Sequence, residues 1–515
     1  MKFNWTAHSW SAGPHLRRRH ERATNDLKGQ AVRGGFAKVC AQAANFLIRI
    51  GSVMALGRLL EPKDFGLVGM VTAVIGVLNL FRDFGLSTAT VQRTSLTDEQ
   101  ISALFWINML VGAALGLLTL VTAPLVAGFY HEPRLVRVTA ALAAGFIFNA
   151  AGVQHGALLQ RQMRFTALAI IDIVSLLAGT IVGISMALMG YGYWALVGMA
   201  LISPVVSSAG VWLAMAWIPG KPQKQAEIRS LIRFGGILTL NGLVVYIAYN
   251  LEKVLLGRFW GAAPLGVYGR AYQLVNIPTE NLNSAAGVVA FAALSRLQND
   301  PNRLKSYFLK AYSLVLALTV PITIVFALFA DDLIFVLLGP KWKDAAPIFR
   351  LLAPTTLIFA MINPLWWLHY SIGMVGRSLK VASVISALVV VGYLIGLPYG
   401  PKGVAFAYSA VLSLWAIPHL AWCVRGTMIS LKDILMAVSR PLFSSVVAGA
   451  LAFCVQYSYG PSLSPLSRLL LGGLIVMGAY LVMLFYVMGQ KQFYVDLLQA
   501  LRQRSSVPEN SLVTA

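Results

Sequence analysis

The sequence predicts an all-α polytopic membrane protein with about fourteen transmembrane helices, arranged as two pseudo-symmetric six-helix lobes followed by two C-terminal helices. Composition is the first observation behind this fold class. Hydrophobic residues make up 58% of the 515-residue chain and charged residues only 12%, about half the charged share of a typical soluble domain. Second, apolar segments of about 20 residues, the length that crosses a ~30 Å hydrocarbon core, recur along the chain. Third, one motif pair occurs twice.

The repeated motif pair lies in a predicted membrane hairpin. Leu56-Gly57-Arg58 recurs as Leu256-Gly257-Arg258, and Phe65–Gly69 recurs as Leu265–Gly269, each 200 residues later. Both copies are expected to begin on the same side of the membrane, so the repeat is parallel and its axis runs along the membrane normal. The sequence therefore predicts two lobes that face each other across this axis.

The predicted spans are apolar runs bounded by charged or turn residues. We expect them at about 37–60, 65–91, 100–129, 136–158, 166–188, 192–217, 234–259, 264–292, 306–329, 347–371, 378–398, 402–424, 440–458 and 467–489. They divide the chain into a basic cytoplasmic tail (1–36), an N-lobe (37–217), a cytoplasmic linker (218–233), a C-lobe (234–424), the two final spans (440–489) and a second cytoplasmic tail (490–515). The longest outer loop, 330–346, is too short for a catalytic domain, so we expect a transporter and not an enzyme.

The basic residues predict the orientation of the chain. With the N-terminus inside, 27 of the 41 Lys and Arg residues fall in cytoplasmic segments and 10 in outer ones, as the positive-inside rule requires. We therefore expect both termini in the cytoplasm. The net charge of +22 is spread over short loops, so it does not indicate a nucleic-acid partner. The first 36 residues have no apolar core of the signal-peptide kind, and no cleavage is expected there.

The three cysteines, Cys40, Cys423 and Cys454, have neither metal-ligand spacing nor the pattern of a disulfide framework. We expect no metal site and no bound cofactor.

Eight ionisable side chains lie inside predicted spans, four of each sign. They are Arg49, Arg82, Asp83, Asp172, Glu252, Lys253, Arg270 and Glu280. Each costs about 2.5–3.5 kcal/mol at a bilayer centre on insertion scales. Such groups should face a water-filled cavity or one another, which favours a transporter.

Three of the cations are candidates for binding an anionic substrate. Arg49 has no acidic residue within a helical turn in the sequence, and arginine suits phosphate or pyrophosphate. The alternative is a structural pair of Arg49 with Asp83 or Asp172. Subtracting the repeat offset places Lys253 one turn from Arg49 on the same helix face. Arg270 lies nearer the outer surface, to which it could instead snorkel.

The other charges are candidates for gating and ion coupling. Arg82 and Asp83 lie toward the cytoplasmic third of their span, where a pair could close the cytoplasmic side, and Glu252 is a further gate or cavity charge. Glu280 and Asp172 are the candidates for coupling to a proton or sodium gradient, because a carboxyl group in a low-dielectric site can bind and release a proton near neutrality.

At these residues the chain resembles a known family. Leu56–Gly66, followed by Asp83–Leu86, is similar to the opening of bacterial polysaccharide flippases of the Wzx type, in the branch that exports colanic acid and succinoglycan. Val267–Leu274 and Leu337–Trp342 are similar to the same branch. The resemblance covers about residues 30–490.

The resemblance implies the fold of the multidrug/oligosaccharidyl-lipid/polysaccharide (MOP) superfamily, whose two lobes open alternately to either side of the membrane. It implies a bacterial inner-membrane flippase that moves undecaprenyl-pyrophosphate-linked oligosaccharide repeat units to the periplasmic leaflet, for exopolysaccharide or lipopolysaccharide synthesis. Cationic cavity residues would hold the pyrophosphate, H+ or Na+ would drive transport, and the last two helices would form a groove for the lipid tail. Membrane lipids are implied partners, and a polysaccharide polymerase and chain-length machinery are further candidates.

Three other functions are open at this point. A drug or cation antiporter of the same superfamily would favour an acidic or aromatic cavity, against which Arg49, Lys253 and Arg270 count. A membrane scaffold for polysaccharide assembly enzymes would not need eight ionisable groups within its spans. A membrane-embedded glycosyltransferase would need a carboxylate base and usually a large outer loop. The sign of the cavity potential separates the antiporter from the flippase.

Overall fold

The computed structural model describes residues 42–82, 87, 90–91, 97–221, 243, 246–459, 462–492 and 494–495. These residues form helices and short connections, and they contain no β-strand. The expected tails at 1–36 and 490–515 and the linker at 218–233 lie wholly or largely outside this part of the chain, as does Asp83.

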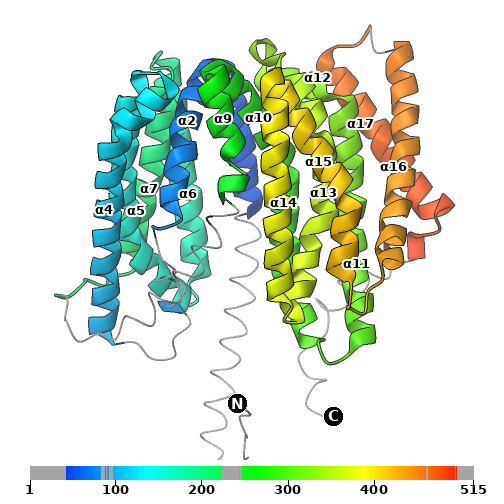
Figure 1. Cartoon of the computed structure of the whole chain (residues 1–515), viewed down its shortest axis with the longest axis horizontal. Helices are drawn as coiled ribbons and strands as arrows, with labels where there is room; N and C mark the ends of the chain where they lie inside the picture. Colours follow the sequence, from blue (N-terminus) through cyan, green and yellow to red (C-terminus); the bar gives the residue numbers. More distant parts are fainter. Residues whose placement is uncertain are drawn as a thin grey trace, which may run out of the picture.

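Figure 1 shows the arrangement of the helices. The α-helices are α2 (Pro62–Asn79), α4 (Asp98–Tyr130), α5 (Arg134–Arg161), α6 (Phe165–Leu188), α7 (Trp194–Ala214), α9 (Leu251–Trp260), α10 (Ala262–Arg296), α11 (Pro301–Leu328), α12 (Ala330–Leu338), α13 (Ala345–Ser371), α14 (Val375–Gly396), α15 (Gly400–Val424), α16 (Leu431–Tyr459) and α17 (Pro465–Val482). A further helical segment covers 42–59. The short helices η1 (Pro340–Trp342) and η2 (Leu397–Tyr399) are 3-10 helices, and η4 (Met483–Val487) is a π-helix.

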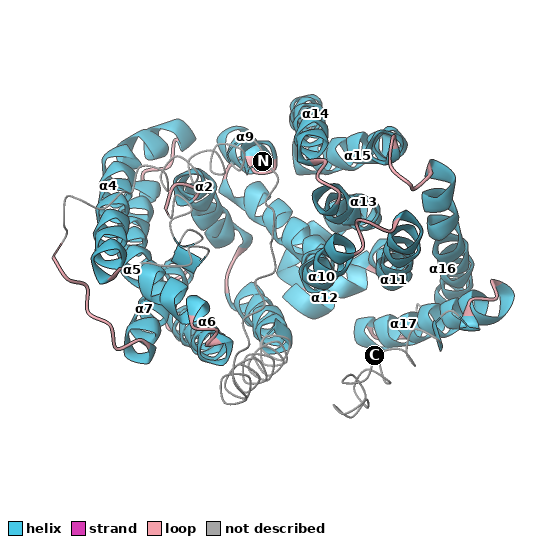
Figure 2. Cartoon of the chain, turned by 90° about the horizontal axis from the view of Figure 1, so that it is seen from below, coloured by secondary structure: helices cyan, strands magenta, loops and turns pink. Residues whose placement is uncertain are grey.

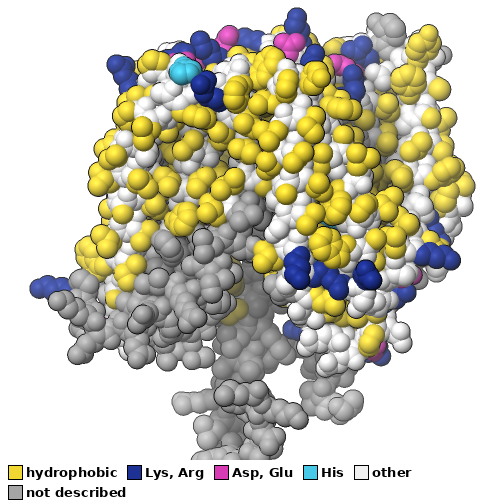
Figure 3. All heavy atoms as spheres, in the orientation of Figure 1, with side chains coloured by type: hydrophobic (Ala, Val, Ile, Leu, Met, Phe, Trp, Pro, Cys, Tyr) yellow, Lys and Arg dark blue, Asp and Glu magenta, His cyan; other side chains and the backbone are white. Residues whose placement is uncertain are grey.

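Nine helical segments of the described chain are long and apolar enough to cross a membrane, and one of them, Gly376–Val424, covers all but the first residue of α14 together with α15. Four expected spans are not among the nine: 37–60, 65–91, 234–259 and 264–292. The first three extend beyond the described residues, and the fourth, α10, carries Arg270 and Glu280. In Figure 3 hydrophobic side chains cover the wall of the molecule, and charged side chains gather along its upper rim. The chain is thus an all-helical, multi-pass membrane protein.

Two expected spans are interrupted next to polar residues. Where we expected one helix over 65–91, α2 ends at Asn79 and a turn follows at Leu80–Arg82. The Asn79 side chain donates to the carbonyl of Ile75 at 3.3 Å, and such local hydrogen bonds compete with those of the helix backbone.

The second interruption lies in the expected span 234–259. The backbone turns at Tyr249–Asn250, immediately before α9. Here the Asn250 side chain donates to the carbonyl of Tyr246 at 3.0 Å. Because of this break, α9 begins as a separate helix, and Glu252 and Lys253 lie in its first turn.

The segment 330–346, expected as an outer loop, is folded into α12 and η1. Trp342 at its end is completely buried. Its indole Nε1 donates to the carbonyl of Gly57 at 2.7 Å, and its ring meets the ring of Phe65 edge-on at 5.3 Å. This segment therefore packs against the helical segment 42–59 and α2.

The helices fall into two groups that meet at α2 and α10. Figures 1 and 2 show α4, α5, α6 and α7 together on one side and α10, α11, α13, α14 and α15 on the other. The last two helices, α16 and α17, pack on each other and on α11 at the far edge of the second group. The long α10 packs against both α13 and α2, and this contact joins the two groups.

Where α2 and α10 cross, each copy of the sequence repeat contacts the other copy through equivalent residues. A Cβ atom at Gly66 would lie 1.7 Å from the carbonyl oxygen of Ala262, and one at Gly266 would lie 1.8 Å from that of Pro62. The two glycines, Gly66 and Gly266, are 200 residues apart, and so are the residues that they meet, Pro62 and Ala262. Only glycine lets two helix backbones approach this closely.

A second reciprocal contact lies beside this crossing. Arg58 Nη2 donates to the carbonyl of Val336, near the end of α12, at 2.6 Å. Its counterpart in the second copy, Arg258, lies over the ring of Phe129, near the end of α4, at 5.7 Å. The two groups of helices are therefore closed against each other at the end where the sequence predicts the outer loops.

Candidate substrate-binding cavity

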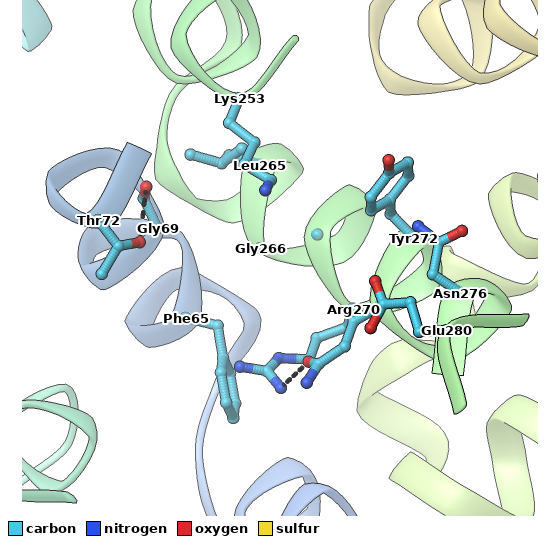
Figure 4. A pocket seen from close by; sticks show the side chains of 12 residues that line it. Phe65, Gly69, Thr72, Lys253, Leu265, Gly266, Arg270, Tyr272, Asn276 and Glu280 are labelled. Carbon is cyan, nitrogen blue, oxygen red and sulfur yellow. Dashed lines mark hydrogen bonds between the residues drawn. The ribbon is translucent and has the colours of Figure 1, made fainter. Parts of the chain in front are cut away.

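A cavity of about 310 Å³ opens between α2, α9 and α10. Three of the eight ionisable groups line it: Lys253, Arg270 and Glu280. Figure 4 shows their side chains converging from α9 and α10, with Phe65 and Thr72 of α2 across the space. The structure therefore brings residues of both sequence copies to one cavity.

Lys253 reaches this cavity because α9 starts anew after the break at Asn250. Its Nζ donates to Asn250 Oδ1 at 2.7 Å and lies 5.8 Å from the ring centroid of Tyr272. An ammonium group has three donors, so one hydrogen bond orients Lys253 and leaves two for a ligand. The asparagine that breaks the helix also positions the cation.

Arg270 connects α10 to α2. Its guanidinium lies 3.9 Å from the ring centroid of Phe65, a cation–π contact, and it donates to Gln273 Oε1. The guanidinium has five N–H donors in a planar fork, so it keeps donors for an anion. Arg270 is thus both a cavity cation and part of the contact between the two helix groups.

Glu280 is the acidic member of the cavity. It is exposed to the cavity and interacts electrostatically with Arg49 and Lys253. Arg49 itself is exposed on the segment 42–59 and is not part of the lining. Two lining cations against one carboxylate make the cavity positive, and Arg49 adds to this sign. A cavity of this kind can hold an anion.

Asp172 and Arg82 lie elsewhere. Asp172 lines a separate cavity of about 190 Å³ between α5, α6 and α7, together with Asn149 and Ser208. Arg82 Nη1 donates to Asn149 Oδ1 at 3.1 Å. Arg82 thus contacts an asparagine that lines the same cavity as Asp172, and neither residue lines the cavity of Lys253.

Glu252 is fully buried on α9 and does not line the charged cavity. Among the described residues no other side chain donates a hydrogen bond to its carboxylate oxygens. It interacts electrostatically with Tyr268 and Tyr393, and the hydroxyls of these tyrosines also lack partners within the described chain. Neighbouring residues in a helix point about 100° apart, which explains why Lys253 reaches the cavity and Glu252 does not.

The sequence alone does not predict Phe65, Thr72 and Gln273 at the site, although all three line the cavity. A signal for one of them was present in α10. Arg270, Gln273, Asn276 and Glu280 recur three or four residues apart and all line the cavity, the spacing of one helix face. Phe65 and Thr72 follow only from the crossing of α2 and α10.

A family model described as polysaccharide biosynthesis protein matches residues 55–347, more than half of the chain. The lipopolysaccharide biosynthesis protein WzxC of Escherichia coli (strain K12) is 25% identical over 347 residues, which cover 66% of this chain and 69% of that protein. The teichuronic acid biosynthesis protein TuaB of Bacillus subtilis (strain 168) is 29% identical over 413 residues, 72% and 83% of the two chains. The succinoglycan biosynthesis transport protein ExoT of Rhizobium meliloti (strain 1021) is 24% identical over 315 residues, 61% and 64%.

Two solved structures share the fold of this chain. The lipid II flippase MurJ, in an inward closed conformation, superposes with a TM-score of 0.71 at 13% identity, over 91% of this chain and 100% of MurJ. An inward-facing MATE multidrug transporter of the MOP superfamily superposes with a TM-score of 0.60 at 15% identity, over 78% and 99%. The fold expected from the resemblance is therefore confirmed.

Proposed function

Because the chain belongs to the polysaccharide biosynthesis protein family, whose model matches residues 55–347, we propose that it flips undecaprenyl-pyrophosphate-linked oligosaccharide repeat units across a membrane. The direction is from the cytoplasmic to the periplasmic leaflet of a bacterial inner membrane, in the synthesis of an exopolysaccharide or lipopolysaccharide. The similarity to WzxC, a lipopolysaccharide biosynthesis protein, and to ExoT, a succinoglycan biosynthesis transport protein, supports this assignment. The observation that carries it is the positive cavity at Lys253 and Arg270.

The chemistry of this cavity suits a pyrophosphate. Arginine offers a planar fork of donors and lysine a compact point charge, and both bind phosphate oxygens. Arg270 supplies the fork and Lys253 the point charge, on two helices that share one cavity. The lipid tail stays in the bilayer while the saccharide occupies the cavity. The positive sign of the lining disfavours a cationic drug as substrate.

Transport proceeds by alternating access of two lobes, 37–217 and 234–424, with both termini in the cytoplasm. The reciprocal contacts at Gly66 and Gly266 close the outer side, so they have to separate before the substrate leaves to the periplasm. Rigid movement of one lobe against the other about a fixed central site is the usual solution in transporters built from repeats. Arg270, which lies over Phe65, connects the cavity to this outer contact.

Glu280 is the candidate for coupling to H+ or Na+. It lines the same cavity as Lys253 and interacts electrostatically with both Lys253 and Arg49. Asp172, in the separate cavity of the N-lobe, is a second candidate. A polymerase and chain-length machinery would receive the flipped unit on the periplasmic side.

The proposal is tested by measuring lipid-linked oligosaccharide in cells that lack this protein. The intermediate should accumulate on the cytoplasmic leaflet, and the wild type should clear it. At equal membrane levels Lys253→Ala and Arg49→Ala should fail to clear it, whereas Lys402→Ala, which removes an exposed cation outside the cavity, should clear it. If nothing accumulates, the flippase assignment is wrong. If Lys253→Ala and Arg49→Ala both clear the intermediate, the function stands and the site is wrong.

A further inference from the structure

A second cavity, of about 340 Å³, lies among α13, α14 and α15 and reaches Tyr249 at the break before α9. Its volume is within the range of roughly 300–1,000 Å³ that small-molecule sites occupy. The described lining contains no Lys, Arg, Asp or Glu. Three aromatic side chains line it, Tyr249, Phe359 and Trp366, and Trp366 is 41% exposed. The group that this cavity suits is therefore uncharged.

Polar side chains interrupt the apolar lining at several points. Asn363 and Ser378 are two of them. His369 Nε2 lies 2.9 Å from the carbonyl oxygen of Cys423, so Nε2 donates, and in the neutral ring Nδ1 is left as an acceptor. His419 also lines the cavity and is 5% exposed, and its Nδ1 has no partner among the described residues.

This combination matches the two sides of a sugar ring. The C–H face of a pyranose is apolar and packs on an aromatic ring, while its hydroxyls both donate and accept hydrogen bonds. Trp and Tyr rings are amphipathic in the same sense. A hydrocarbon chain in this cavity would leave the polar lining side chains, Asn363, Ser378 and His419, without partners from the ligand, at a cost of a few kcal/mol. A neutral saccharide would not.

The neutral cavity adjoins the charged one. Tyr249 lines the neutral cavity and Lys253, four residues later, lines the charged cavity. Tyr249 also lies near Tyr272, which belongs to the charged lining. A ligand whose sugars are covalently joined to a pyrophosphate could occupy both cavities at once.

We propose that the cavity at Trp366 is a saccharide subsite, in which a neutral pyranose ring of the substrate packs on Trp366 and hydrogen-bonds to Asn363 and His419. The inference rests on the proposed function, because it assigns the sugar part of the same substrate. It adds that the chain recognises the sugar itself and does not bind the lipid pyrophosphate alone.

The test is equilibrium binding to the purified full-length protein in nanodiscs. The probes are undecaprenyl pyrophosphate without sugar and the same lipid carrying one glucose, galactose or N-acetylglucosamine. The wild type should bind at least one glycosylated lipid about tenfold more tightly than the bare lipid, and Trp366→Ala should abolish this difference without weakening bare-lipid binding. Trp366→Tyr should restore it. The matched control is Trp106→Ala, which removes a tryptophan of similar exposure, 44%, on α4.

The remaining outcomes separate the two proposals. If the wild type binds all four lipids equally, or if Trp366→Ala weakens bare and glycosylated lipids alike, the saccharide subsite is wrong. In either case the charged site still stands, provided that Lys253→Ala weakens binding of the bare lipid. If the wild type binds none of the four lipids, both the subsite and the flippase assignment are overturned.

Discussion

We propose that Lys253, Arg270 and Glu280 together select the ligand of the charged cavity. Their presence inside spans could be predicted, because an ionisable group in a membrane helix is too costly to be incidental. Their convergence could not be predicted in full. Lys253 depends on the break at Asn250 and on a hydrogen bond to its side chain, and Arg270 depends on Phe65 from a distant helix. Both are tertiary contacts that no local pattern in the sequence specifies.

Replacing the carboxylate of Glu280 should raise the affinity of the charged cavity for anions. Glu280→Gln removes the negative charge that acts on Lys253 and Arg49. Bare undecaprenyl pyrophosphate should then bind about fivefold more tightly at low salt, since unit charges a few ångström apart in water interact by about 1 kcal/mol. Titration calorimetry in nanodiscs measures the effect, and the gain should shrink at high salt. Unchanged or weaker binding by Glu280→Gln at low salt would mean that Glu280 does not oppose the ligand.

Among the helices, the crossing of α2 and α10 explains the sequence repeat. The repeat predicted two related hairpins, and the structure shows why their glycines are needed: Gly66 and Gly266 each meet the backbone of the other copy. Predicted and observed helix bounds agree within a few residues for most elements, for example 166–188 against Phe165–Leu188. The difference is larger for α16, which begins at Leu431 and not at 440. There Asp433 accepts hydrogen bonds from Ser430 and pairs with Lys305 at 2.6 Å, so a polar turn extends the helix beyond its apolar run.

Adding a methyl group at the crossing should hold the outer side open. In Gly66→Ala or Gly266→Ala the new Cβ would meet a backbone carbonyl at less than 2 Å, so α2 and α10 cannot close. Transport should fall at least tenfold at unchanged membrane levels. In a background without Cys40, Cys423 and Cys454, a reporter cysteine at Thr72, which lines the cavity, should react faster with a membrane-impermeant maleimide added from the periplasmic side.

The control for this experiment is Gly128→Ala on α4, where an added Cβ meets nothing within 4 Å. Its transport and labelling should equal those of the parent. Normal transport by Gly66→Ala and Gly266→Ala would show that the crossing does not have to close as tightly as it does in this structure.

In the whole molecule, the side that we predict to be the outer one is closed by contacts between segments far apart in the chain. Trp342 reaches Gly57, Arg58 reaches Val336, and Lys341 Nζ lies 3.4 Å from Glu61 Oε1. The two related halves could be predicted from the sequence repeat. The helices within 330–346, which we expected to be a loop, could not be predicted. The apolar run Leu333–Leu338 is too short for a span, and the burial of Trp342 depends on the other half of the molecule.

Flipping by the purified protein in liposomes tests whether the chain is a flippase. The probe is the lipid-linked oligosaccharide extracted from cells that lack this protein, and its arrival in the outer leaflet is followed by oxidation with membrane-impermeant periodate. The wild type should expose the sugar well above the rate of protein-free liposomes, and Lys253→Ala should reduce the rate about tenfold or more. With Glu61→Cys and Lys341→Cys joined by a reducible bis-maleimide in the cysteine-free background, flipping should stop, and reduction should restore it. A wild-type rate equal to that of protein-free liposomes would contradict the account, and an unaffected rate in the cross-linked protein would contradict alternating access at this outer contact.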